Sequence, residues 1–253
     1  GNYKRPAGIT FNNEYDINNE IGQIYLFVGN SCPWCQRTLL VHKIKNLSRE
    51  VKVVFLKADI EHGEWIFNKP FKGCIRLSEL YKKANKKIIF RATLPILVGF
   101  MKDELNILSN ESSQIIRLLN SIKSELRYQT VNIQECNQEF LDLIHNNIND
   151  GVYRCGFARN QSSYEKASKN LFAALNEVEN TMRRNQGDWI LGEELTYADI
   201  YLFPTLIRWE LIYRKLFKCT EKDISDFEKI LEWRLKFFKL PNVDKTCHEN
   251  EWK

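Results

Sequence analysis

Ser31-Cys32-Pro33-Trp34-Cys35-Gln36-Arg37-Thr38 is the stretch that decides how this chain folds at its start. It follows an apolar run over 24–28 and precedes an amphipathic run over 38–44, which is the order strand, turn, helix. Pro33 suits the first turn of a helix because proline has no N–H group to leave without a partner. The pattern therefore predicts that a helix begins directly after Cys32.

A cysteine at the start of a helix has the chemistry of a nucleophile. Free backbone N–H groups and the positive end of the helix dipole both favour the thiolate there, and such a thiol reacts at neutral pH. We therefore predict that Cys32 is the nucleophile of a redox or thiol-transfer reaction. Cys35 lies one turn later on the same side of the helix, where it either resolves a mixed disulfide or is simply a small buried residue.

The same C-x-x-C pair has two other interpretations, half of a structural zinc site or two inert core thiols. The remaining cysteines make no second pair with this spacing, and none has a histidine at zinc-finger distance. The strand–turn–helix context and Pro33 favour a thioredoxin-like interpretation over both.

Composition places the chain among ordinary globular proteins. Its 253 residues are 43% hydrophobic, and 37 basic against 32 acidic residues leave a net charge of +5 that is spread along the chain. This balance does not indicate a nucleic-acid or membrane partner, and no segment approaches the ~20 apolar residues of a membrane span. Seven cysteines at irregular spacings do not indicate a disulfide framework, so we expect a cytoplasmic location.

Periodicity divides the chain into a polar segment over 1–20, an α/β domain over 21–128 and an all-α domain over 129–253. In the α/β domain we predict strands at 24–28 and 51–56, then a long excursion over 59–90 with a short helix near 77–83. Strands at 96–98 and 105–108 should pair antiparallel because the turn between them is short, and a helix follows from residue 109.

After residue 130 the strand signals disappear. Residues 133–149 have a helical pattern, a capping box at Ser162–Glu165 predicts the start of another helix, and Thr196 with Asp199 predicts a third. Residues 224–239 make a last amphipathic helix. The expected fold is therefore a thioredoxin-like domain followed by an all-helical domain.

Several strings in this order resemble the glutathione transferase superfamily. Leu94-Pro95 stands before a strand, where that superfamily has a cis-proline, and Glu111-Ser112 stands at a helix start, where it has its γ-glutamyl-binding pair. Thr196-x-x-Asp199 is similar to its helix-capping box in the second domain.

The cysteine-type branches are the most similar, first the glutathionyl-hydroquinone reductases of the xi class and then the omega class. The strings that carry this resemblance are Cys32-Pro33-Trp34 with 37–39, the segments 63–67, 110–117 and 149–158, and the run 195–208. The chain departs from the reductase pattern in having Cys35 in place of alanine and Gln36 in place of histidine. We expect the tyrosine- and histidine-containing extension of that branch to be absent here or replaced by 248–252.

The resemblance implies roles for seven further residues. Trp65 would be a wall of the glutathione site, Leu94 before a cis Pro95 would present its backbone to the cysteinyl part of glutathione, and Glu111 and Ser112 would hold the γ-glutamyl end. Tyr153 and Tyr213 would line the pocket of the second substrate and act as hydrogen-bond or proton donors. Buried core tyrosines, a tryptophan that fixes a loop and plain helix capping are the structural alternatives.

The function that the resemblance implies is a glutathione-dependent thiol transferase or reductase, acting on S-glutathionyl-hydroquinones or similar conjugates through a mixed disulfide on Cys32. Its alternatives are an omega-like disulfide or dehydroascorbate reductase, a non-catalytic glutathione-binding protein, and an iron–sulfur cluster held between two chains. Glutathione is the expected co-substrate and no metal is expected. The expected partners are a small aromatic or glutathionylated substrate and a second copy in a homodimer, with neither nucleic acid nor a membrane.

Overall fold

A computed structural model describes residue 11 and residues 16–84, 92–123 and 131–252. The chain separates into two compact units. The first, here called the sheet unit, lies between Ala7 and Thr130 and includes Thr246–His248. The second, the helical unit, contains Val131–Lys245 and the residues from Glu249 on. Most of the predicted polar segment 1–20 and the predicted boundary at residue 128 lie outside the described residues.

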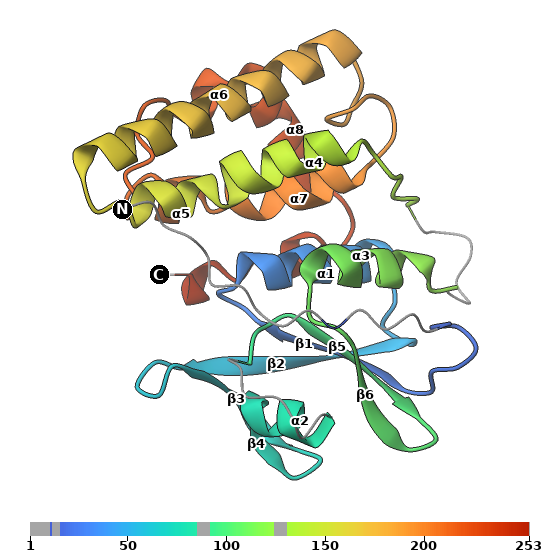
Figure 1. The fold of residues 1–253 in the computed structure, drawn as a ribbon. Coiled ribbons are helices and arrows are strands. Elements are labelled where there is room, and N and C mark those ends of the chain that lie inside the picture. Colours follow the sequence, from blue (N-terminus) through green and yellow to red (C-terminus); the bar gives the residue numbers. More distant parts are fainter. Residues whose placement is uncertain (1–10, 12–15, 85–91, 124–130, 253) are drawn as a thin grey trace. The chain divides into compact units, whose positions relative to one another are not determined.

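The sheet unit is built on a mixed sheet with the strand order β4-β3-β2-β1-β5-β6 (Figure 1). Its strands are β1 (Ile24–Gly29), β2 (Val51–Asp59), β3 (Glu64–Phe71), β4 (Cys74–Arg76), β5 (Ile96–Met101) and β6 (Glu104–Ser109). β1 and β2 pair parallel, and every other neighbouring pair is antiparallel. The predicted antiparallel pairing of the strands at 96–98 and 105–108 is confirmed.

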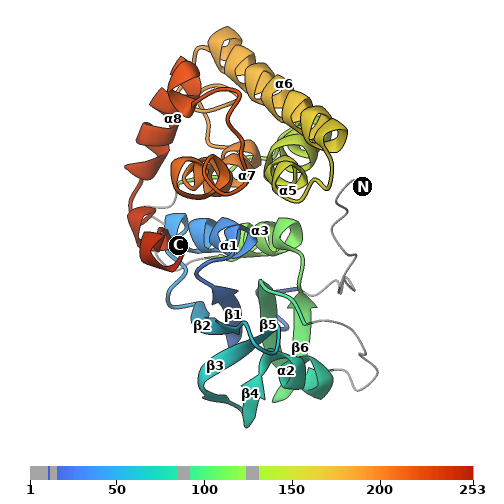
Figure 2. The ribbon, with the colours of Figure 1, turned by 90° about the vertical axis from the view of Figure 1, so that its left-hand side faces the viewer.

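Helices cover both faces of this sheet. The helices α1 (Pro33–Ile44) and α3 (Ser112–Ser121) lie on one face and α2 (Leu77–Ala84) on the other, as both views show (Figures 1 and 2). From Cys35 to His42 every residue of α1 is buried, and the helix packs on the sheet and against α3 beside it. The sheet unit therefore holds the predicted nucleophile at the end of its central strand.

The prediction of an irregular excursion over 59–90 is wrong for its first half. β3 and β4 occupy 64–76, and β3 pairs with β2 from Glu64 opposite Asp59 to Phe67 opposite Leu56. The sequence does not indicate this strand, because it contains Pro70 and lysine, and proline is ordinarily excluded from paired strands. The structure accommodates Pro70 at an exposed position where the pairing of β3 with β4 shifts register. The short helix predicted near 77–83 is confirmed as α2.

The helical unit contains no strand among its described residues. It consists of α4 (Gln138–Leu143), the π-helical turn η1 (Ile144–Asn149), α5 (Gly151–Gly156), α6 (Gln161–Asn185), α7 (Tyr197–Leu206), the π-helical turn η2 (Trp209–Tyr213), α8 (Glu228–Phe238) and the 3₁₀ turns η3 (Ile224–Asp226), η4 (Asp244–Thr246) and η5 (Glu249–Glu251). All ten residues of α7 are buried, so this helix forms the core around which the others pack. None of the helices described is long and apolar enough to cross a membrane.

Two predicted helix starts can be compared with the structure. Thr196 and Asp199 form the capping box that begins α7, as predicted. The predicted box at Ser162 is wrong, because α6 begins two residues earlier and Asn160 is its cap. The Asn160 side chain accepts the N–H of Ser163 at 2.9 Å, as the side chain of a helix cap does. Ser162 therefore lies inside the first turn of α6.

Candidate active site

Cys32 caps the start of α1, as the sequence predicts. Its backbone is extended, Pro33 is the first helical residue, and the N–H of Cys35 donates to Cys32 Sγ at 3.4 Å. The side chain is only half-buried, whereas the rest of the helix behind Cys35 is buried. The sulfur therefore faces the backbone donors of a helix start while it remains open to a reactant.

The loop before β5 brings a backbone carbonyl to this sulfur. The peptide bond between Leu94 and Pro95 is cis, and Cys32 Sγ lies 4.0 Å from the Leu94 oxygen. Tyr81 of α2 fixes the same loop by donating its hydroxyl to the Thr93 oxygen at 2.9 Å. Burial raises the pKa of Tyr81, so the phenol stays protonated and keeps this hydrogen bond.

The start of α3 has a polar edge made by successive residues. Glu111 is the cap residue of α3, and its side chain makes no capping bond; its N–H instead donates to Ser109 Oγ at 3.1 Å. Arg37, buried in α1, donates through Nη1 to Ser112 Oγ at 3.2 Å. The Ser112 hydroxyl that accepts from Arg37 keeps its own hydrogen for another acceptor. The Glu111 side chain thus takes no part in helix capping, and the Ser109 hydroxyl accepts a backbone N–H at the helix start.

Trp65 stands on β3 and packs on the end of β1. A Cβ placed on Gly29 would lie 2.4 Å from its ring atom Cζ3, so only glycine leaves room for the indole at this point. The Gly29 oxygen also accepts the N–H of Cys32 at 3.1 Å, which places Trp65 beside the turn that carries Cys32. Trp65 is therefore part of a strand of the sheet and not of a loop, and Gly29 connects it to Cys32.

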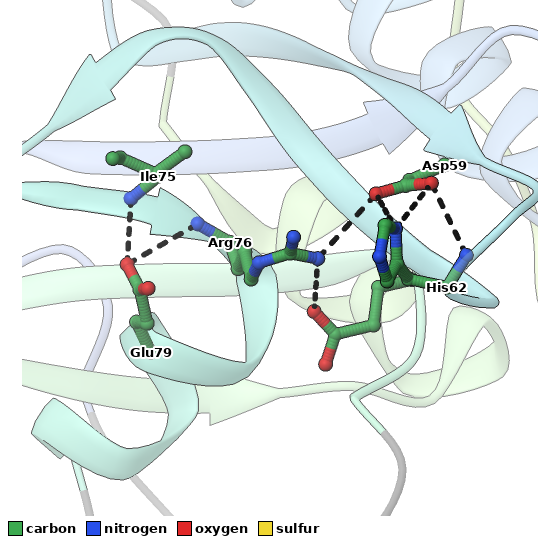
Figure 3. A network of polar contacts seen from close by, with 6 residues as sticks. Asp59, His62, Ile75, Arg76 and Glu79 are labelled. Carbon is green, nitrogen blue, oxygen red and sulfur yellow. Dashed lines mark hydrogen bonds and ion pairs between the residues drawn. The ribbon is translucent and has the colours of Figure 1, made fainter.

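A surface network holds the strand that carries Trp65 (Figure 3). Arg76 Nη1 donates to Glu64 Oε2 at 3.1 Å and to Asp59 Oδ2 at 3.4 Å, which joins the ends of β2, β3 and β4. Glu79 accepts the N–H groups of Ile75 and Arg76 at the start of α2. The hydrogen bond from His62 lowers the pKa of Asp59, so this carboxylate stays charged opposite the guanidinium.

Cys35 is placed differently from Cys32. Its side chain has no exposed surface, and its sulfur accepts the N–H of Gly29 at 3.4 Å. A sulfur in this position is shielded from a soluble thiol or disulfide. The geometry therefore separates a half-exposed thiol from a buried one within a single helical turn.

The two predicted tyrosines meet in the helical unit. The hydroxyls of Tyr153 on α5 and Tyr213 on η2 lie 3.5 Å apart, with the ring centroids at 5.9 Å. Phe217 packs against both rings, at 5.2 Å from Tyr153 and 5.5 Å from Tyr213. Tyr153 is half-buried and Tyr213 is 1% exposed, so Tyr153 offers the more accessible phenol of the pair.

Sequence reasoning missed two residues that shape this site. Arg37 was noted only as part of a matching string, and Tyr81 was not considered, although they secure the start of α3 and the loop before β5. Their partners lie 75 and 12 residues away in the chain, so no local spacing signals either contact. Within the described ranges, no three His, Cys, Asp or Glu side chains gather as metal ligands.

Comparison with known proteins identifies the family. The model of the glutathione S-transferase N-terminal domain matches residues 31–122, and that of the C-terminal domain matches residues 161–235. The glutathionyl-hydroquinone reductase PcpF of Sphingobium chlorophenolicum is 34% identical over 223 residues, which are 83% of this chain and 70% of PcpF. The chain belongs to the glutathione transferase family.

Solved structures place this glutathione transferase beside the xi class. The xi glutathione S-transferase of Phanerochaete chrysosporium matches with a TM-score of 0.84 and 28% identity, covering 99% of this chain and 91% of that one. The glutathione-bound structure of YqjG from Escherichia coli matches with a TM-score of 0.79 and 28% identity, covering 93% of this chain and 79% of that one. The predicted fold and the predicted enzyme class, a glutathione transferase-like enzyme, are both confirmed.

Proposed function

We propose that this enzyme is a glutathione-dependent reductase that removes glutathione from S-glutathionyl conjugates, glutathionyl-hydroquinones first among them. The observation that carries the proposal is the half-exposed sulfur of Cys32 at the start of α1, 4.0 Å from the carbonyl before a cis-proline. PcpF is named a glutathionyl-hydroquinone reductase, and the YqjG structure is described as glutathione-bound. The name of PcpF supports the reaction class, and the YqjG structure supports glutathione as the ligand.

The sheet unit offers groups that suit each part of glutathione. The backbone of Leu94 would pair with the cysteinyl residue, which puts the tripeptide sulfur beside Cys32. Glu111 would bind the γ-glutamyl ammonium, and the Ser112 hydroxyl, oriented by Arg37, would donate to its carboxylate. Trp65 would form the wall on the β3 side. These roles are our assignment; they come from the resemblance to the glutathione transferases, and the contacts of these groups support them.

The proposed reaction has two steps. The Cys32 thiolate attacks the glutathionyl sulfur, the bond from that sulfur to the ring carbon breaks, and a tyrosine phenol gives a proton to the leaving carbon. Tyr153 is the better donor and Tyr213 the residue that orients it, since their hydroxyls lie 3.5 Å apart and Tyr153 is the more exposed. A second glutathione then attacks the mixed disulfide, releasing oxidised glutathione and the Cys32 thiolate.

Cys35 is unsuited to the second step in this proposal. Its sulfur is fully buried and accepts the N–H of Gly29, so attack on a disulfide at Cys32 would require the first turn of α1 to open. We therefore propose that a second glutathione, and not the Cys35 thiol, breaks the mixed disulfide on Cys32.

Mass spectrometry of the intact protein tests the proposal. After addition of a glutathionylated hydroquinone, the wild type should carry one adduct of about 305 Da, the mass of a glutathionyl group in mixed-disulfide linkage. Cys32→Ser should carry none and should have no turnover, whereas the matched variant Cys35→Ser should keep both. Equal activity of wild type and Cys32→Ser would refute the nucleophile. Turnover of glutathionyl disulfides without turnover of the hydroquinone conjugate would refute the proposed substrate and indicate an omega-like reaction.

A further inference from the structure

The helical unit contains a cavity that the proposed reaction does not use. It is open to solvent and lies where the end of α5 meets the start of α6, two helices that are neighbours in both ribbon views (Figures 1 and 2). Residues of the segment 214–220 form its other side. Its volume is about 630 Å³, which is in the range of small-molecule sites. We call it the α5–α6 cavity.

The charge of this cavity is one-sided. Four of its lining residues are cationic, and none is acidic; the cations are Arg159, Arg214, Lys215 and Lys218. Arg214 is engaged by Asp223, with Nη2 3.1 Å from a carboxylate oxygen. The other three cations make no ion pair with any residue in the described part of the chain. Uncompensated positive charge around a hollow attracts and retains anions.

Nearby carboxylates are turned to other partners. Glu165 accepts the side-chain amide of Gln161 at 3.0 Å, and Glu221 accepts the hydroxyl of Ser168 at 3.2 Å. Neither carboxylate lines the cavity. Apart from the pair between Arg214 and Asp223, the positive charge of the lining is therefore not cancelled at close range.

The wall of the cavity is fixed by hydrogen bonds rather than left to a flexible loop. Tyr164 on α6 donates its hydroxyl to the Lys218 oxygen at 2.6 Å, which ties the segment 214–220 to the helix. Asn160 caps α6 from the same wall, and the positive end of this 25-residue helix adds to the local field. Leu216 and Phe217 add apolar surface beside the cations. A wall of this kind favours a ligand with an organic framework over a bare ion.

We propose that the α5–α6 cavity binds a small organic anion that carries at least two negative charges, as phosphate or carboxylate groups. Arginine suits both groups because its planar fork donates two parallel hydrogen bonds, and lysine adds point charges at the rim. The site is formed entirely by the helical unit and does not depend on the chemistry proposed at Cys32.

Titration calorimetry on the full chain tests this site with fructose 1,6-bisphosphate and citrate as separate probes, at low ionic strength. Saturable binding of either is the expected result: binding of the bisphosphate alone indicates a phosphate ligand, binding of citrate alone a polycarboxylate, and binding of both a general polyanion site. The double variant Arg159→Gln/Lys215→Gln should weaken binding about tenfold or more, because it removes two charge-assisted contacts. Lys239→Gln is the control. It removes an exposed positive charge at the end of α8, which does not line the cavity, and it should leave the affinity for both probes unchanged.

A second variant keeps the test valid if the double variant folds poorly. Leu216 is 65% exposed, so Leu216→Glu should not disturb the core, yet it places a negative charge among the cations. It should also weaken binding about tenfold or more. The proposal is overturned by no binding of either probe up to about 10 mM, by an unchanged affinity in Leu216→Glu, or by an equal loss in Lys239→Gln.

Discussion

Gly29→Ala tests directly how the end of β1, the Trp65 ring and the turn that carries Cys32 are packed. The added Cβ would stand 2.4 Å and 2.6 Å from two ring atoms of Trp65, where 3.4 Å is the start of ordinary contact. The ring must therefore move by about 1 Å. Gly29 has no positive φ, so the backbone itself accepts alanine and the whole cost comes from the ring. Overpacking of this size costs about 1–3 kcal/mol, and the half-buried position of Trp65 favours the lower half of that range.

The measurement is urea unfolding followed by far-UV circular dichroism, in a double-mutant cycle with Trp65→Ala. We expect Gly29→Ala to lower the free energy of unfolding by about 1–2 kcal/mol in the wild type and by less than about 0.5 kcal/mol once the ring is gone. Gly151→Ala is the matched control, since its Cβ would meet Leu171 at an ordinary 3.5 Å. An equal cost of Gly29→Ala in both backgrounds would refute the packing argument.

Three further predictions rest on other parts of the structure. Gly156→Ala should cost about 1–3 kcal/mol because its Cβ would lie 2.4 Å from the Phe217 ring; unchanged stability in urea would contradict this contact. Asp199→Ala should lower the free energy of unfolding by about 3 kcal/mol or more, because the buried carboxylate accepts four hydrogen bonds; a loss below about 1 kcal/mol would show that those donors find other partners. Burial lowers the pKa of His42 below its ordinary value of 6.5. As the pH falls below about 6.5, the unfolded chain therefore binds a proton at His42 before the folded protein does. The folded protein loses stability over this pH range for that reason. His42→Gln should therefore lose less stability than wild type between about pH 7 and pH 5, and parallel curves would refute the assignment.

The active-site helix and the capping boxes show what neighbouring residues determine. The start of α1 at Pro33 and the cap of α7 at Thr196 depend on contacts within four residues, and the sequence predicts both. The strand β3 does not follow from its own residues, since it holds Pro70 and several exposed positions. Its pairing with β2 decides its structure, because strand formation depends on a partner supplied from elsewhere in the chain.

The amino-acid sequence by itself determined that a helix begins directly after Cys32 and which family the chain resembles. Only the tertiary structure decided that Cys35 is closed off while Cys32 is open, that Arg37 orients Ser112, and that Tyr153 meets Tyr213 across 60 residues. It also gathered the cations of the α5–α6 cavity from 159 and from 214–218. The physical reason is range: a helix start is set by backbone groups a few residues apart, whereas burial and side-chain pairing depend on which distant segments pack together.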